Sequence, residues 1–491
     1  MTADEPQQPA GGDEAEKIRL TTASTKIQVT RSLAVPSSAL SGAWQTPKQR
    51  RNANAVAAFG TVVEWYDFSI FFYLSTTLSA VIFGGNTEGL LFTLGIGAVG
   101  FLFRPVGAVV FGHIGDRFGR KLSLIVSIIL MAASMFGIAA MPGFDSIGMW
   151  AAVGVIALRC LAGFSVGGEY TGIMVYLVES APPGKRGITA SWGAANSGLG
   201  ALFAAGAAAI VAKIATPEGM DQWGWRVLFA LGGVLALIML PLRRHLQETD
   251  SFNRSQEDEE LEQLKDLNPL MEVFRHQKKA LAMAFLISSV GSVSYFLNIT
   301  YVPTMLENSY GLSTSDSLML GTLSGIVVVL VTPLFGWLAD RFSRRAIFTG
   351  VGAIFLVTTI PAYLLIGGKG IVIAALGVIV LAIPAAGWSA VAASAIPEQF
   401  TAIGRYSGMA ISYNVATALF GVVAPFAATL LVQKTGTNLA PAYYATFFTV
   451  AVAIPAIILL REVGRRTMKD IDHGVDLEEK RKEKELVAVG G

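Results

Sequence analysis

Twelve long apolar runs dominate the sequence, and they restrict the possible fold more than any other feature. Most of them exceed the roughly 20 residues that a helix needs to cross a bilayer. Only 15% of the 491 residues are charged, whereas a soluble domain carries about a quarter. Because a spanning segment must satisfy its own backbone hydrogen bonds, we expect an all-α polytopic membrane protein with 12 transmembrane helices. The runs lie at 55–83, 90–112, 121–141, 147–178, 188–213, 223–242, 280–305, 317–338, 346–366, 370–395, 406–432 and 441–461.

A charged turn of the same design occurs twice, each time between two apolar runs. The first copy ends the stretch RPVGAVVFGHIGDRFGRK, and the second is GWLADRFSRR. A second spacing also repeats, because Glu179 precedes Arg186 by seven residues and Glu398 precedes Arg405 by seven. Both repeats indicate a duplicated chain, which we expect to form two pseudo-symmetric six-helix halves. A parallel repeat of this kind places the substrate site near the bilayer midplane, between the halves.

The distribution of basic residues predicts the orientation in the membrane. Lys and Arg follow the second, fourth, sixth, eighth and tenth runs, whereas the opposite loops GGNTEG, MPGFDS, TPEGMDQ and ENSYGLSTSDS hold none. Since cytoplasmic loops are rich in Lys and Arg, both termini are expected in the cytoplasm and the protein in the cell membrane.

The polar stretches predict the domain boundaries. Residues 1–52 lack the apolar core of a signal peptide, so we expect a disordered cytoplasmic tail there. The charged stretch containing QEDEELEQLKD is expected to be a partly helical linker. We also expect 147–178 to form one long helix. The predicted order is a tail (1–52), the N-terminal half (53–242), the linker (243–279), the C-terminal half (280–462) and a second cytoplasmic tail (463–491).

Ionisable residues inside the apolar runs of the N-terminal half are the first candidates for function, because charges within a membrane are costly. Glu64 and Asp67 are three residues apart, share a helix face and lie about 10–18 Å into the first run. Arg104 and Arg159 lie at a similar depth. Two readings stay open: these groups line a polar cavity, or they pair with each other to hold the half together. Glu169, nearer the inner end of its run, is a further proton-coupling candidate beside Glu64 and Asp67.

The C-terminal half offers aromatic and amide side chains in place of charges. An ionic half that faces an aromatic half suits a zwitterionic ligand, because arginine holds a carboxylate and aromatic faces attract an ammonium group. The alternative is that most of these rings only pack against lipid or other helices. The candidate substrate-binding residues are Arg104, Arg159, Trp65, Tyr66, Tyr295, Asn298, Tyr301, Trp388 and Asn414, with Tyr413 beside them.

Several stretches resemble the metabolite:H⁺ symporter family of the major facilitator superfamily. The resemblance rests on FGTVVEWYDF, RPVGAVVFGHIGDRFGRK, GFSVGGEYTG, PPGKRG and LRRHLQETDSF, and it covers residues 55–461. Together with TYVPTML, RYSGMAISYN and PAYY, the sequence is most similar to the proline/glycine betaine transporters. The resemblance implies the major facilitator fold and proton-coupled uptake through an alternating-access cavity, with no cofactor because a proton gradient drives transport.

The resemblance also implies that the loop after the second run governs a conformational switch and does not contact substrate. The residues expected in this switch are Gly112, Asp116, Arg117, Gly119 and Arg120, with Glu179, Arg186, Asp340, Arg341, Glu398 and Arg405.

Our working hypothesis is a symporter that functions as a monomer. A proton binds Glu64 or Asp67, the substrate carboxylate engages Arg104 or Arg159, and the loaded carrier then rocks inward. The main alternative is an organic acid:H⁺ symporter for α-ketoglutarate, citrate, shikimate or a dicarboxylate. An efflux pump and a sensor without turnover are further alternatives. We expect no enzyme, metal site or nucleic-acid partner, because the sequence has no Walker A loop, HExxH motif, nucleophile elbow or Cys/His cluster.

Overall fold

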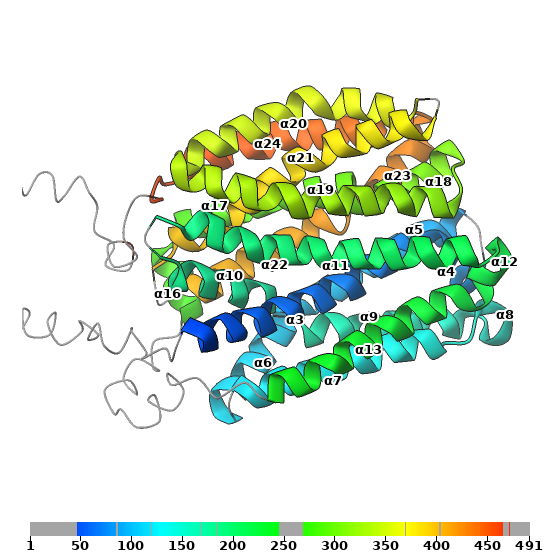
Figure 1. The fold of residues 1–491 in the computed structure, drawn as a ribbon, viewed down its shortest axis with the longest axis horizontal. Helices are drawn as coiled ribbons and strands as arrows, with labels where there is room; N and C mark the ends of the chain where they lie inside the picture. Colours follow the sequence, from blue (N-terminus) through cyan, green and yellow to red (C-terminus); the bar gives the residue numbers. More distant parts are fainter. Residues whose placement is uncertain are drawn as a thin grey trace, which may run out of the picture.

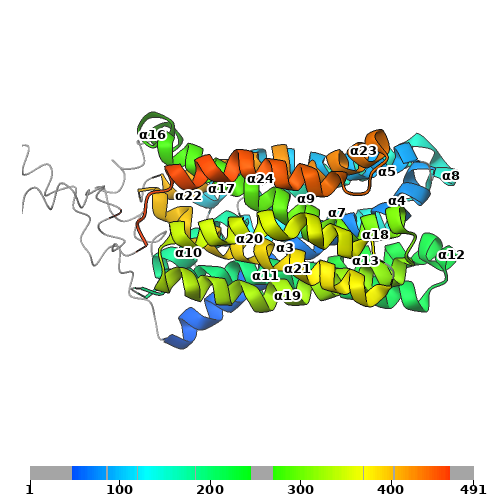
Figure 2. The ribbon, with the colours of Figure 1, turned by 90° about the horizontal axis from the view of Figure 1, so that it is seen from above.

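The structure is a computed structural model that describes residues 47–84, 87–118, 120–167, 169–182, 184–244, 269–368, 370–401, 404–464 and 471. Within these ranges the side chains of 47–59, 87–88, 112–118, 120–124, 180, 242–244, 269–270 and 272 are not described. Long helices run nearly side by side along the longest axis of the molecule (Figures 1 and 2).

The first group of helices, residues 47–244, forms the lower layer of Figure 1. Its elements are α3 (Pro47–Tyr73), α4 (Ser75–Phe83), α5 (Thr87–Leu102), α6 (Arg104–Phe118), α7 (Arg120–Ala140), α8 (Phe144–Ile147), α9 (Met149–Ser165), α10 (Glu169–Ser180), α11 (Arg186–Ile214), α12 (Pro217–Gly219), the π-helical turn η1 (Met220–Gly224) and α13 (Trp225–Arg244).

Most of the second group, residues 269–459, forms the upper part of Figure 1, while α16 and α22 lie lower, near α10 and α11. Its elements are α16 (Pro269–His276), α17 (Lys278–Tyr295), the π-helical turn η2 (Phe296–Thr300), α18 (Val302–Tyr310), α19 (Thr314–Arg341), α20 (Arg344–Ile366), α21 (Ile371–Ala395), the 3₁₀ turn η3 (Pro397–Gln399), α22 (Arg405–Ala416), the π-helical turn η4 (Thr417–Gly421), α23 (Ala424–Thr435) and α24 (Ala440–Leu459).

The predicted apolar runs are helical in the part of the chain that the structure describes. Ten helices there are long and apolar enough to cross a membrane, and α3 and α4, bent by 65° at their junction, count as an eleventh span if taken together. The run at 121–141 corresponds to α7, whose shorter apolar part is Ile125–Ala140. Large apolar side chains such as Leu330 and Val357 are about 70% exposed. Such exposure suits a surface that faces lipid.

One helix differs from its prediction. The run at 147–178 forms one apolar span, Met149–Glu179, but the helix is interrupted within that span, because α9 ends at Ser165 and α10 begins at Glu169. The intervening stretch contains Gly167, where a Cβ would overlap the carbonyl oxygen of Arg104. The chain thus breaks where α6 passes close to it, a contact that only glycine permits.

The predicted boundaries fall partly outside the described residues. Helix α3 already begins at Pro47, six residues before the N-terminal half was expected to start. Helix α13 continues to Arg244, and α16 and the first residues of α17 occupy the end of the predicted linker. The residues expected to form the two tails and most of the linker, 1–46, 245–268, 465–470 and 472–491, lie outside the description.

The two ends of the bundle differ in the elements they carry. Helix α3 begins and α24 ends at one end, here called the terminal end (Figures 1 and 2). The short helices α8 and α12 lie at the opposite end, here called the loop end. Helices α11 and α19 pack against each other and join the two halves.

Candidate functional site

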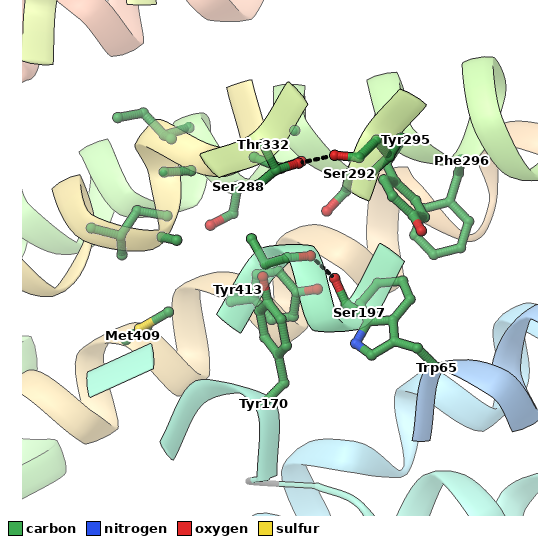
Figure 3. Close-up of a pocket in the computed structure, with 18 residues that line it drawn as sticks. Trp65, Tyr170, Ser197, Ser288, Ser292, Tyr295, Phe296, Thr332, Met409 and Tyr413 are labelled. Carbon is green, nitrogen blue, oxygen red and sulfur yellow. Dashed lines mark hydrogen bonds between the residues drawn. The ribbon is translucent and has the colours of Figure 1, made fainter. Parts of the chain in front are cut away.

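A cavity of about 50 Å³ lies between the two halves (Figure 3). One face of α17 contributes Ser288, Gly291, Ser292 and Tyr295, which recur at the three- and four-residue spacing of a helix. Helices α3, α10 and α11 close the cavity from the N-terminal half, and η2, α19, α21 and α22 complete the wall from the other half. The full lining consists of Trp65, Tyr170, Ala194, Ser197, Ile287, Ser288, Gly291, Ser292, Tyr295, Phe296, Val328, Thr332, Ser389, Ala392, Ala393, Ile396, Met409 and Tyr413.

Four aromatic side chains meet in the wall of this cavity, and they come from both halves. The Trp65 ring lies 5.8 Å from that of Tyr170 and 5.3 Å from that of Tyr295, in edge-to-face contacts. Tyr170 stacks on Tyr413 with their centroids 4.8 Å apart. Aromatic faces at this spacing attract a cation that comes within about 6 Å. These four residues are called the aromatic box below.

The cavity wall holds no charged side chain. None of its 18 residues is Asp, Glu, Lys, Arg or His. A ligand with a net charge would therefore lose its hydration without gaining a counter-charge, which is costly. The wall suits a ligand whose net charge is zero.

The four central charges of the N-terminal half form two separate ion pairs. Arg104 donates to Glu64 over 2.7 Å, and Arg159 donates to both oxygens of Asp67 over 3.1 and 3.0 Å. All four side chains are at most 7% exposed. Each charge is thus neutralised within its own half. Of the two interpretations that the sequence left open, the structure shows the one in which these groups pair with each other. None of the four lines the cavity.

The guanidinium group of each of these two arginines lies over the face of a phenylalanine ring. The guanidinium carbon of Arg104 lies 3.9 Å from the centre of the Phe101 ring, and that of Arg159 lies 4.8 Å from the centre of Phe71. The Glu64–Arg104 pair also interacts electrostatically with Tyr413 of the aromatic box. This pair is therefore a neighbour of the cavity, although it does not reach its surface.

Charged residues join the two halves at the terminal end. Glu179 accepts from Arg405 over 2.7 Å, and Glu398 pairs with Arg186 over 3.0 Å, so each member of one sequence repeat binds the other repeat. Glu398 also pairs with Arg344 over 3.0 Å. These five side chains are called the terminal network below.

Asp340 links the halves at the same end through the start of α11. Its carboxylate accepts from the backbone N–H groups of Gly187 and Ile188 over 2.6 and 2.8 Å. An anion at a helix N-terminus interacts favourably with the unpaired N–H groups and the helix dipole. Asp340 therefore fixes the terminal end of α11 to α19.

Uncharged and acidic groups join the halves at the loop end. Ser75 and Thr304 share a hydrogen bond of 3.0 Å, and Asn308 donates to the Thr76 hydroxyl over 2.9 Å. Glu307 accepts from Thr314 over 2.6 Å. It lies beyond the apolar span Lys278–Thr300. The halves are thus in contact at both ends, with the cavity between them.

Burial raises the pKa of Glu307 above its ordinary value. Hydrogen bonds from Thr314 and Thr76 oppose this shift, because they stabilise the charged carboxylate, and the negative charge of Asp221 adds to it. Glu307 is therefore a carboxylate whose charge is disfavoured at the contact between the halves.

The predicted substrate-binding residues divide into two groups. Trp65 and Tyr295 line the cavity, and so does Tyr413. Tyr66, Asn298, Tyr301, Trp388 and Asn414 lie outside the lining, as do Arg104 and Arg159.

The residues outside the lining have other partners. Tyr66 donates to the carbonyl of Leu228, and Trp388 donates to the carbonyl of Ile287. Tyr301 accepts from Thr429, Asn298 accepts from Tyr363, and Asn414 donates across the halves to the carbonyl of Gly167. Periodicity could not distinguish these positions from Tyr295. It indicates that a tyrosine, tryptophan or asparagine is buried, but it does not indicate which neighbour the side chain contacts.

The predicted proton-coupling residues also separate. Glu64 and Asp67 belong to the two ion pairs, while Glu169 is the first residue of α10 and is half-buried there. Glu169 thus lies beside Tyr170 of the aromatic box in the chain, but it does not line the cavity.

The predicted switch residues are described in part. Glu179, Arg186, Glu398 and Arg405 form the terminal network, and Asp340 lies next to it. Arg341 lies outside it, exposed and over the ring of Trp337 at 5.2 Å. Side chains of the remaining predicted members, Gly112, Asp116, Arg117, Gly119 and Arg120, lie outside the description.

Sequence reasoning missed several residues of the two sites. Arg344 belongs to the terminal network. The sequence feature that could have indicated it is its position four residues after Asp340, because Arg120 likewise lies four residues after Asp116. Tyr170 belongs to the aromatic box, and its signal was its place beside Glu169 in the motif GFSVGGEY. The small and polar lining residues, Ser197, Ser288, Ser292, Thr332 and Met409, gave no distinguishing signal.

We find no group of three or more His, Cys, Asp or Glu side chains that could hold a metal ion in the described residues.

Comparison with known proteins identifies the family. The sequence matches the family described as "Sugar (and other) transporter" over residues 53–473. The chain belongs to this transporter family of the major facilitator superfamily. This membership confirms that the protein is a multi-pass membrane transporter and not an enzyme.

Two curated relatives resemble this transporter over most of its length. The ectoine/proline transporter ProP of Corynebacterium glutamicum is 34% identical over 438 residues, which cover 86% of each chain. The proline/betaine transporter of Escherichia coli is 32% identical over 430 residues, which cover 85% of each chain. These relatives confirm the subfamily that the sequence motifs indicated.

A solved structure confirms the expected major facilitator fold. The xylose transporter XylE from E. coli, in a partially occluded inward open conformation, superposes with a TM-score of 0.66. The alignment covers 85% of this chain and 99% of that one, at 19% identity.

Proposed function

We propose that this transporter is a proton-coupled symporter that imports a small zwitterion such as proline or glycine betaine by alternating access. One observation carries the substrate class: the cavity between the halves combines the aromatic box with a wall free of charge. Aromatic faces attract an ammonium group, and a charge-free wall admits a ligand whose net charge is zero. The names of the relatives, an ectoine/proline and a proline/betaine transporter, support the same class.

The alternative substrate class, a dicarboxylate or related organic acid, would need a positive charge in the cavity. Arg104 and Arg159 were the candidates for that role, but each is already paired with a carboxylate outside the lining. Exposing either arginine to a ligand would leave Glu64 or Asp67 buried and unpaired, which is costly. The zwitterion is therefore the better-supported ligand.

We propose that the proton enters at Glu64 or Asp67. Protonation of either acid removes the charge that holds its arginine, so the ion pair can rearrange when the ligand binds. Release of the proton and ligand on the other side would restore the pair and permit the empty carrier to return. No cofactor takes part, because the proton gradient supplies the driving force.

Contacts at the two ends of the bundle would alternate in this cycle. The terminal network closes one end and the Ser75–Thr304 and Thr76–Asn308 contacts close the other, so each set must open in turn. The positive-inside pattern of the loops supports a cytoplasmic terminal end in the cell membrane. We propose that one chain is sufficient for transport, because the cavity is built from the two halves of a single chain.

Uptake into proteoliposomes with an imposed inward proton gradient tests this function. Labelled glycine betaine and proline are compared with α-ketoglutarate and shikimate. We expect the two zwitterions to accumulate and a protonophore to abolish the accumulation. Uptake of an organic acid alone would contradict the zwitterion assignment, and accumulation that is insensitive to the protonophore would contradict proton coupling.

A further inference from the structure

The cavity of this transporter contains buried hydrogen-bond donors that have no acceptor in the part of the chain that the structure describes. The indole N–H of Trp65 and the hydroxyl of Tyr295 have no hydrogen-bond partner among the described residues, although both side chains are more than nine-tenths buried. Both residues line the cavity. An unsatisfied buried donor is unfavourable, so a pair of them in one cavity indicates a place where a ligand supplies the acceptor.

The two donors belong to side chains whose rings are in contact. The Trp65 and Tyr295 rings meet edge to face with their centroids 5.3 Å apart, one from each half of the molecule. Figure 3 shows the indole nitrogen of Trp65 on the edge of the ring that faces Tyr170 and Tyr413. The indole donor of Trp65 therefore lies beside the rings that would hold an ammonium group.

We propose that Trp65 Nε1 and Tyr295 Oη bind the carboxylate of the zwitterion, in place of the arginines. This assignment rests on the proposed function and deepens it. Arg104 and Arg159 are engaged by Glu64 and Asp67 and do not line the cavity, whereas the residues that carry the two uncharged donors do. Uncharged donors satisfy a carboxylate without adding a net charge to the cavity, so the bound zwitterion leaves the site neutral.

A third buried donor, Ser288 Oγ, also lines the cavity without a described partner. It lies seven residues before Tyr295 on the same face of α17, which is about 10 Å along the helix axis. That separation exceeds the width of one carboxylate. We therefore assign the carboxylate to Trp65 and Tyr295 alone.

The assignment predicts which substrates the cavity separates. Choline carries the same trimethylammonium group as glycine betaine, but a hydroxymethyl group stands in place of the carboxylate. The aromatic faces alone cannot distinguish betaine from choline. Donors that bind the carboxylate favour betaine, in addition to the charge-free wall, which already disfavours the net positive charge of choline. Trp65 and Tyr295 are then specificity-determining residues that meet the ligand at the boundary between the halves.

The test uses conservative variants of the full chain in proteoliposomes. Tyr295→Phe keeps the ring and removes only the hydroxyl donor, whereas Trp65→Phe keeps an aromatic ring but removes part of the indole together with the N–H donor. We expect each to weaken glycine betaine and proline binding roughly tenfold or more, as expected for a lost hydrogen bond to a charged group. Weak competition by choline should stay unchanged. Tyr301→Phe is the matched control, because it removes a hydroxyl outside the cavity and should leave all affinities as they are.

The double variant Glu64→Gln/Arg104→Gln provides the opposing test. It removes both charges of one pair at once and leaves no lone buried charge, so betaine affinity should persist even if coupled transport fails. Unchanged betaine affinity in both aromatic variants, with a loss in the double variant, would overturn the assignment and return the carboxylate to Arg104. A wild-type protein that binds neither zwitterion would contradict the proposed function itself, and the assignment with it.

Discussion

At the scale of single residues, the buried charges and the ligand cavity are separate in the structure. Proton coupling and ligand binding, which the sequence could not assign to different residues, can therefore be assigned separately. Glu64, Asp67, Arg104 and Arg159 look equally suited to bind a proton or a ligand when only their depth is known. The structure pairs them with one another, two by two, and leaves the cavity to uncharged side chains. The charges are then free to take part in coupling, while the aromatic box meets the ligand.

Replacement of Asp67 tests the coupling task. Asp67→Asn cannot bind or release a proton, so it should abolish proton-driven accumulation yet keep counterflow exchange, which involves only the loaded carrier. Uptake of labelled betaine is measured once with a proton gradient and once as counterflow without one. Asp145→Asn, at an exposed position, is the control. Intact accumulation would remove Asp67 from the mechanism.

The Asp67 variant also leaves Arg159 buried beside a neutral partner, an imbalance that costs about 3–5 kcal/mol in other proteins. The double variant Asp67→Asn/Arg159→Gln removes both charges. It should recover the thermal unfolding midpoint and still fail to accumulate substrate. Recovery of accumulation together with stability would show that the single variant only disturbed folding.

Glu307 gives a prediction about pH. Its pKa in the folded protein is raised from the usual 4.5, so the stability it contributes is present below that value and is lost as the pH rises through the folded pKa. Glu307→Gln mimics the neutral acid and should remove this loss. The difference in unfolding midpoint between variant and wild type should therefore grow in favour of the variant over the pH range above the usual value of 4.5. A difference that shrinks over this range would contradict the burial of Glu307.

At the scale of helices, glycine sets how closely neighbouring elements approach. A Cβ at Gly163 of α9 would overlap the carbonyl oxygen of Gly100 of α5, and one at Gly107 of α6 would overlap the carbonyl oxygen of Phe164. Small residues at helix crossings are the usual means of close packing in membranes. Helices α5 and α6 thus lie against α9, near the Arg159 that belongs to it.

Gly163→Ala tests this packing. The added methyl group must push α9 away from α5, and overpacking of this kind typically costs about 1–3 kcal/mol. We expect a lower unfolding midpoint and weaker uptake. Gly95→Ala on α5 is the matched control, since nothing lies within 4 Å of its Cβ position. Equal effects of the two substitutions would contradict the close crossing.

Much of this level of structure could be predicted from the sequence, and the exceptions have physical causes. The apolar runs predicted the helices because every spanning segment must be long and apolar. The break at Val166 could not be predicted, because it depends on how closely α6 passes Gly167. The partners of Tyr66, Tyr301 and Trp388 depend on side-chain contacts between distant helices, which periodicity does not encode. The repeat spacing predicted Glu179, Arg186, Glu398 and Arg405, but not that each repeat pairs with the other.

At the scale of the whole molecule, two sets of contacts hold the halves together around one cavity. The terminal network uses ion pairs, in which Glu179 is exposed and the other four side chains are buried, whereas the loop end uses hydroxyl and amide groups with the acid Glu307. Among the described residues, ion pairs join the halves at the terminal end alone. The two ends then differ in strength, which biases a carrier between its two open states.

Glu398→Gln weakens the terminal end. It removes the carboxylate that joins Arg186 of one half to Arg344 of the other, so the terminal end should open more often. Spin labels at Lys185 and Phe342, in a Cys160→Ser background, should report a longer and broader distance distribution. Arg341→Gln is the matched control, because Arg341 lies outside the network. An unchanged distribution in Glu398→Gln would contradict a gating role for the network.

The most direct test of the central claim is the movement of protons when substrate is added. Proteoliposomes in a weakly buffered medium are given glycine betaine, proline, α-ketoglutarate or shikimate, and the external pH is followed. The account predicts that the medium becomes more alkaline on addition of betaine or proline, and does not change with either organic acid. Alkalinisation with an organic acid alone, or betaine accumulation without any proton movement, would contradict a zwitterion symporter built around an uncharged aromatic cavity.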